Sequence, residues 1–93
     1  MSEVRMTARP RLTTHARLQW DPVRRRQVLL APERVLVLNE TAAAILARCD
    51  GLRSVADISA DLANEYRNVP EPEVLAFLGR LVGKRLIEVP NHE

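Results

Sequence analysis

Three short stretches in the first half of the chain show the apolar spacing of β-strands. In residues 17–20 apolar and polar side chains alternate, and Asp21-Pro22 then supplies a turn signal. A second extended run covers residues 26–30 and ends at Ala31-Pro32-Glu33, and a third covers residues 34–38. Because only tight turns separate these runs, we expect an antiparallel meander of three strands.

After Asn39 the apolar spacing changes to that of α-helices. Asn39 is a good N-cap for a first helix, and Gly51 is a plausible residue to end it. Ser54 and Asp57 form a capping-box pattern at the start of a second helix, and a third begins after Pro70. The apolar positions that mark the three buried faces are Ala42, Ile45, Leu46 and Cys49; Val55, Ile58, Leu62 and Tyr66; and Val74, Phe77, Leu78, Leu81 and Val82.

The order of these elements predicts an α+β fold, with a three-stranded antiparallel sheet followed by three α-helices. Residues 1–14 show no hydrophobic period, so we expect a flexible basic N-terminal arm there. Residues 15–90 form a single predicted domain, which closes with a brief extended segment over residues 86–89. Residues 91–93 are a short tail.

A length of 93 residues corresponds to one small domain with a thin core. No apolar run reaches the roughly 20 residues of a membrane-spanning helix, so we expect a cytoplasmic protein with no membrane partner. The net charge of +2 conceals an asymmetry, because residues 1–34 carry +5 and residues 35–93 carry −3. This basic front, residues 1–34, suits an acidic protein or peptide or a nucleic acid as a partner, or it is an arginine-rich segment that only solvates the end of a strand.

The residues that catalysis needs are scarce. His15 and His92 lie near the two ends, and Cys49 falls on an apolar helix face, where we expect a buried neutral thiol. One cysteine and two histidines at this spacing match no metal site, and only three glycines are present, none in a phosphate-binding loop. The sequence therefore favours a protein that is not an enzyme and holds no cofactor.

The third strand is unusual because residues 35–38 are apolar on both sides, whereas a strand with one wet face alternates. Two interpretations remain open. Either the helices cover the sheet on this side, or the strand is an edge that receives a partner. An open edge beside a helix with apolar side chains is a geometry that binds an incoming peptide strand.

Several of these segments resemble the pyrroloquinoline quinone (PQQ) biosynthesis protein D family. The resemblance covers about residues 11–89, and Ala31 departs from it, since relatives often carry an aromatic residue before Pro-Glu. The matching residues are Val28-Leu29-Leu30-Ala31-Pro32-Glu33-Arg34, Leu38-Asn39-Glu40-Thr41-Ala42, Ile45-Leu46, Cys49-Asp50-Gly51, Val55, Ile58, Leu62, Tyr66, Val74, Phe77, Leu78 and Leu81.

This resemblance implies a winged-helix-like peptide chaperone, or RiPP recognition element, without a cofactor. Such a module binds the ribosomally made PQQ precursor peptide and presents it to a radical S-adenosylmethionine enzyme. The peptide is expected as an added strand between the third strand and the third helix, and Arg34 and Arg80 are expected to bind its carboxylates. The expected peptide-binding residues are Arg34, Val35, Leu36, Val37, Leu38, Glu73, Val74, Phe77, Leu78, Arg80 and Leu81.

A winged-helix protein that binds nucleic acid is the alternative, because a basic arm suits phosphate contacts. Glu71 and Glu73 at the start of the third helix disfavour it, since a helix that reads bases carries basic or amide side chains. An apolar strand edge would also allow a homodimer.

Overall fold

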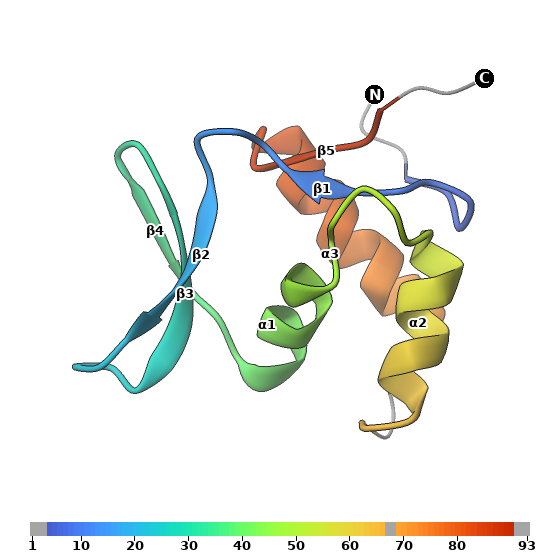
Figure 1. The fold of residues 1–93 in the computed structure, drawn as a ribbon, viewed down its shortest axis with the longest axis horizontal. Coiled ribbons are helices and arrows are strands. Elements are labelled where there is room, and N and C mark those ends of the chain that lie inside the picture. The colour runs from blue at the N-terminus through green and yellow to red at the C-terminus, as the bar shows by residue number, and fades with distance from the viewer. Residues whose placement is uncertain (1–3, 67–68, 91–93) are drawn as a thin grey trace.

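A three-stranded sheet stands at one end of the molecule, and three helices pack together at the other (Figure 1). The structure is a computed structural model that describes residues 4–66 and 69–90. Its elements are β1 (Arg11–Leu12), β2 (Arg17–Asp21), β3 (Arg26–Ala31), β4 (Arg34–Val37), α1 (Glu40–Ala47), α2 (Val55–Ala63), α3 (Glu71–Gly83) and β5 (Ile87–Glu88). The predicted α+β fold of three antiparallel strands followed by three helices is confirmed.

The sheet has the order β2-β3-β4, and both neighbouring pairs are antiparallel. Leu29 pairs with Leu36, and both contribute to the hydrophobic core on the helix side of the sheet. Val28 pairs with Val37 on the opposite face, where Val28 is buried and Val37 is exposed, and neither side chain belongs to the core that the helices share. The helices therefore cover one face only, and β4 is an open edge within the described residues.

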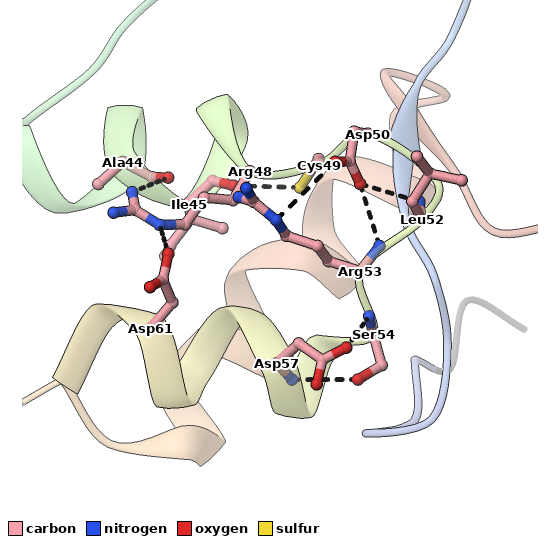
Figure 2. A network of polar contacts seen from close by, with 10 residues as sticks. All are labelled: Ala44, Ile45, Arg48, Cys49, Asp50, Leu52, Arg53, Ser54, Asp57 and Asp61. Atoms are coloured by element: carbon pink, nitrogen blue, oxygen red, sulfur yellow. Dashed lines mark hydrogen bonds and ion pairs between the residues drawn. The ribbon is translucent and has the colours of Figure 1, made fainter. Parts of the chain in front are cut away.

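The predicted helix starts are confirmed by their caps. The Asn39 side chain accepts a hydrogen bond from the Ala42 amide. Ser54 and Asp57 form the reciprocal bonds of a capping box, which Figure 2 shows. The predicted end of the first helix at Gly51 is wrong, because α1 ends at Ala47.

A polar turn accounts for the earlier end of α1. The Asp50 carboxylate accepts hydrogen bonds from the amides of Leu52 (2.8 Å) and Arg53 (3.0 Å), which stabilises a turn instead of a further helical residue (Figure 2). Gly51 lies in this turn with a φ of 80°, in the left-handed region that glycine adopts without strain.

Residues 4–14 do not form the expected flexible arm. Val4 is buried, and the carbonyls of Met6 and Ala8 accept hydrogen bonds from the amides of Ala56 and Val55. These amides belong to the first turn of α2 and have no partner inside their helix. Backbone hydrogen bonds thus hold this segment in place. Because such bonds do not depend on apolar side chains at regular spacing, the sequence pattern did not predict the ordered segment. Residues 1–3 of the expected arm and the expected tail at residues 91–93 lie outside the described residues.

The segment then continues into β1, which pairs with β5 near the other end of the chain. Arg11 lies opposite Glu88, and its guanidinium forms an ion pair with the Glu88 carboxylate at 2.6 Å. The predicted extended segment at residues 86–89 is present, but this pairing was not predicted. None of the helices in the described part of the chain is long and apolar enough to cross a membrane.

Arg48 joins α1 to α2 at the base of the helical layer. Its guanidinium binds Asp61 at 2.6 Å and Glu65 at 3.1 Å, and it also donates to the Ala44 carbonyl at 2.9 Å (Figure 2 shows the Asp61 and Ala44 contacts). Because Arg48 is largely buried, these three acceptors satisfy a charge that would otherwise be costly to remove from water. The polar bridge sets the position of α1 against α2.

Candidate functional site: an open strand edge and a groove

The outer edge of β4 presents unpaired backbone groups. The Leu38 amide donates to the Gln27 carbonyl at 3.0 Å, so the backbone groups of residue 38 point toward β3. In an antiparallel ladder every second residue bonds on the same side, and Leu36 therefore also faces β3. It follows that the N–H and C=O groups of Val35 and Val37 point outward along the open edge.

The side chains of the same two valines are exposed. Val35 is 55% and Val37 48% exposed, whereas Leu36 between them packs against the core. This alternation resolves the all-apolar pattern of the strand, since one side faces the helices and the other faces solvent. An edge with outward hydrogen-bonding groups and exposed β-branched side chains is suited to pairing with a further strand.

One hydrogen bond and one residue of the groove relate this edge to α3. At one end of β4 the Arg34 guanidinium donates to the Lys84 carbonyl, which lies just beyond the last turn of α3, at 3.1 Å. At the other end the chain passes through Leu38 to Asn39, which lines a groove against α3. The strand β4 is therefore linked to the end of α3 through Arg34, and the chain after it leads through Asn39 into the groove beside α3.

The groove has a volume of about 450 Å³ and lies between α1 and α3. Six of its ten lining residues are apolar and four are polar or charged. Its lining residues are Asn39, Thr41, Ala42, Ile45, Val69, Glu73, Val74, Ala76, Phe77 and Arg80. The Arg80 guanidinium lies 5.9 Å from the centre of the Phe77 ring, so a cation and an aromatic side chain share one wall.

The expected peptide-binding residues divide into three groups in the structure. Four of them lie together in the groove, namely Glu73, Val74, Phe77 and Arg80. Five belong to β4 and the residue after it, namely Arg34, Val35, Leu36, Val37 and Leu38; among these the open edge is formed by the two valines. The remaining two, Leu78 and Leu81, are buried in the core.

Leu78 is 0% and Leu81 5% exposed, so both side chains pack in the core of this structure, and their expected contacts with a peptide stay a prediction. The apolar residues of α3 that face the core and those that face the groove follow the same helical period. The sequence pattern therefore does not distinguish the two groups. The Arg34 guanidinium donates one hydrogen bond to the Lys84 carbonyl, and its expected role in binding a peptide carboxylate stays a prediction.

The α1 side of the groove was missed as a binding surface. Asn39 was identified only as a helix cap, and Thr41, Ala42 and Ile45 carry no pattern that distinguishes a groove wall from an ordinary helix. The one feature of the sequence that points to this wall is the small size of Thr41 and Ala42, because a larger side chain at either position would fill the groove.

The groups considered for chemistry do not gather into a site. Burial raises the pKa of the Cys49 thiol to about 12, and the thiol contacts the Ile45 carbonyl, so the predicted buried neutral cysteine is confirmed (Figure 2). His15 is exposed, and His92 lies outside the described residues. Within residues 4–66 and 69–90 no cluster of histidine, cysteine and carboxylate side chains is able to hold a metal ion.

Comparison with protein families gives a match over residues 26–87 to coenzyme PQQ synthesis protein D (PqqD). The chain is 40% identical over 91 residues to the PqqA binding protein of Stutzerimonas stutzeri, covering 96% of this chain and 99% of that protein. It is 49% identical over 80 residues to the PqqA binding protein of Rhodopseudomonas palustris strain BisB5, covering 83% and 78% of the two chains.

Among solved structures, the fold matches the NMR structure of the PqqD truncation of Methylobacterium extorquens PqqCD, described as a functional, stand-alone RiPP recognition element. The TM-score is 0.78 with 36% sequence identity, and the match covers 94% of this chain and 96% of the other. Family, sequence relatives and fold therefore agree over the sheet and the three helices, and the chain belongs to the PqqD family of coenzyme PQQ synthesis proteins.

Proposed function

We propose that this protein binds the precursor peptide of PQQ as an added strand on the open edge of β4, beside α3. The observation that carries the proposal is the outward direction of the backbone groups of Val35 and Val37. The N–H and C=O groups of these two valines form ladder hydrogen bonds with an incoming peptide strand, and the groove binds side chains of that peptide. The relatives named PqqA binding proteins support this assignment.

The protein acts by binding and not by catalysis. It holds the peptide in the cytoplasm and presents it to a radical S-adenosylmethionine enzyme, which modifies it. When one extended segment of the peptide is bound along the strand edge, the other residues of the peptide stay accessible to a second protein, as a substrate carrier requires. Arg80 at the groove wall is placed to bind a carboxylate of the peptide.

The same open edge would allow two copies to pair through β4. Because that pairing uses the groups of Val35 and Val37, it competes with the peptide. Sedimentation velocity with and without precursor peptide tests this arrangement, since a dimer formed through the edge dissociates when the peptide is added.

The proposed function is tested by calorimetric titration with the PQQ precursor peptide from the same genome. We expect saturable binding to the wild-type protein. Replacing Val35 with proline removes the outward amide but leaves the bonds to β3 intact, so we expect at least a tenfold loss of affinity. The matched control is Val35→Thr, which keeps the amide and the β-branched shape and should bind within about threefold of wild type.

A folded Val35→Pro variant with unchanged affinity would place the peptide elsewhere on the molecule. No peptide binding by the wild type, together with an affinity for duplex DNA that falls steeply with salt, would instead favour a nucleic-acid-binding protein.

A further inference from the structure

A second group of exposed apolar side chains lies away from the peptide edge, on the hairpin formed by β2 and β3. Trp20 is 52% and Val23 90% exposed. Figure 1 shows the turn between these strands at the far end of the sheet, away from α2 and α3. Neither side chain lines the groove, so peptide binding there does not explain their exposure. Exposed apolar groups that cluster on one surface mark interaction sites.

Between this hairpin and α1 lies a cleft of about 620 Å³, which we call the hairpin cleft. Leu18 and Trp20 line it on the sheet side, and Ala43, Ala44 and Ala47 line it on the α1 side. Because the three alanines end at Cβ, they leave room beside the indole for an apolar side chain of another molecule. The cleft therefore has the form of an anchor pocket.

Two arginines on the sheet side of the cleft have no ion-pair partner among the described residues. Arg25 and Arg26 both line the cleft, and neither takes part in the ion pairs of the structure. Their neighbour Arg24 differs, because it binds Asp21 at 2.6 Å. Tryptophan and arginine are the residues most enriched at the energetic centres of protein interfaces.

The other charged groups that line the cleft are Glu40 and Arg48. Arg48 is already bound by Asp61 and Glu65, so its charge is compensated. Glu40 stands at the start of α1 and repels an approaching anion. The attraction for carboxylates is thus concentrated at Arg25 and Arg26, on the hairpin side.

The hairpin cleft and the peptide groove use different faces of α1. Ala43, Ala44 and Ala47 share one helical face toward the sheet, whereas Ala42 and Ile45 face α3. Only Asn39, the residue before the helix, lines both. The hairpin cleft consequently stays open when the groove is filled.

We infer that the hairpin cleft docks a second protein, whose apolar side chain enters beside Trp20 while adjacent carboxylates bind Arg25 and Arg26. This inference rests on the proposed function, in which the enzyme that modifies the peptide is that second protein. A nucleic acid fits less well, because the alanine side chains of the cleft offer its phosphates no hydrogen-bond donor and the Glu40 carboxylate repels them.

Trp20 is the only tryptophan of the chain, so it serves as a specific reporter of this cleft. Protein labelled with 5-fluorotryptophan should give a single fluorine resonance. We expect the resonance to shift or broaden when the radical S-adenosylmethionine enzyme is added, and to change little with the precursor peptide alone. A resonance that responds to the peptide and not to the enzyme overturns the inference.

Variants then test the contacts by titration against the same enzyme. Trp20→Ala, and separately the double change Arg25→Asn with Arg26→Glu, should each weaken enzyme binding at least tenfold and keep peptide affinity within twofold. Asparagine tolerates the left-handed φ of 56° at Arg25, so the double variant is expected to fold. Leu52→Ala and Arg9→Glu are the controls, as exposed residues that line neither the cleft nor the groove.

Unchanged enzyme affinity in both cleft variants, or no complex with the wild-type enzyme at all, overturns the inference while peptide binding still supports the proposed function. Loss of peptide and enzyme binding together would make the cleft part of the peptide site. Loss of binding to a single-stranded oligonucleotide, with the enzyme unaffected, would replace the protein partner by a nucleic acid.

Discussion

At the scale of single residues, one strained backbone position lies in the turn that leads into the peptide edge. Pro32 and Glu33 connect β3 to β4, and Glu33 has a φ of 65°. A proline followed by a residue with positive φ is the arrangement of a type II turn, in which glycine is preferred at the second position. The side chain at Glu33 therefore opposes the conformation that the hairpin needs.

Replacing Glu33 with glycine should raise the free energy of unfolding by about 0.5–1 kcal/mol. Relief of the left-handed conformation contributes about 1–2 kcal/mol, and the greater freedom of glycine in the unfolded chain offsets part of it. Urea denaturation measures the change. Equal or lower stability of the variant would show that the Glu33 side chain makes a compensating contact.

The thiol of Cys49 provides a second residue-scale prediction. Because its pKa is raised to about 12, almost no thiolate is present at about pH 8.5, where a free cysteine is half ionised. Alkylation by iodoacetamide should be slow in the folded protein and fast in concentrated guanidinium. Equal rates in the two states, followed by mass spectrometry, would contradict the burial of this side chain.

At the scale of secondary structure, periodicity and capping chemistry predicted most elements. The alternation in residues 17–20 and the caps at Asn39 and Ser54 predicted the sheet and two helix starts, because these signals lie within a few residues of one another. The strand pair β1–β5 was missed, since each strand has two residues and no alternation is detectable over that length. Its partners also lie 77 residues apart in the chain, as Arg11 and Glu88 show.

The site was predictable to a similar extent. The apolar run of β4 left two interpretations open, a strand covered by the helices or an edge that receives a partner, and the structure shows an open edge with the outward groups of Val35 and Val37. Leu78 is buried in the core, and the sequence did not distinguish it from the groove residues, because the apolar residues of α3 that face the core and those that face the groove follow the same helical period. The α1 wall of the groove is formed by small residues such as Thr41 and Ala42. Their role could not be predicted from the sequence, because it depends on how α1 packs against α3.

The Arg48 bridge between α1 and α2 makes stability depend on pH. Its guanidinium lowers the pKa of the Asp61 carboxyl below the ordinary value of 3.8, chiefly through the side-chain hydrogen bond. A lowered carboxyl pKa contributes stability that is fully present above about pH 4 and is lost as the pH falls through the folded-state value.

We therefore expect Asp61→Asn to be less stable than wild type at neutral pH and to lose less stability on acidification. Thermal unfolding between neutral pH and about pH 3 measures this difference. Asp57→Asn is unsuited as a control, because Asp57 caps α2; Glu40→Gln, at an exposed residue, serves instead. Parallel acid profiles for Asp61→Asn and wild type would contradict the role of the bridge.

At the scale of the whole molecule, the two ends of the chain hold the helical layer together. Residues 4–12 satisfy the first amides of α2 and pair with β5, which follows α3. Deleting residues 2–8 should lower the free energy of unfolding by about 2–4 kcal/mol, through loss of the buried Val4 and of two backbone hydrogen bonds. Chemical denaturation of the shortened protein measures this loss, and unchanged stability would restore the flexible arm that the sequence suggests.

The charge asymmetry is also a property of the whole molecule. Five of the eight arginines in residues 1–34 lie on the three-stranded sheet or its β2–β3 turn, namely Arg17, Arg24, Arg25, Arg26 and Arg34, and the acidic excess lies in the helical half. The proposed account assigns the peptide to one side of α1 and a second, acidic protein to the other. A carrier that must contact its peptide and an enzyme together requires two such separate surfaces.

The central claim is that the peptide pairs with the open edge of β4, and amide hydrogen exchange by NMR tests it most directly. In the free protein the amides of Val35 and Val37 should exchange quickly, whereas those of Leu36 and Leu38, which face β3, should be protected. Addition of the precursor peptide should slow exchange at both valines and leave the two leucines little changed. Saturable peptide binding with no new protection at Val35 and Val37 would contradict the account.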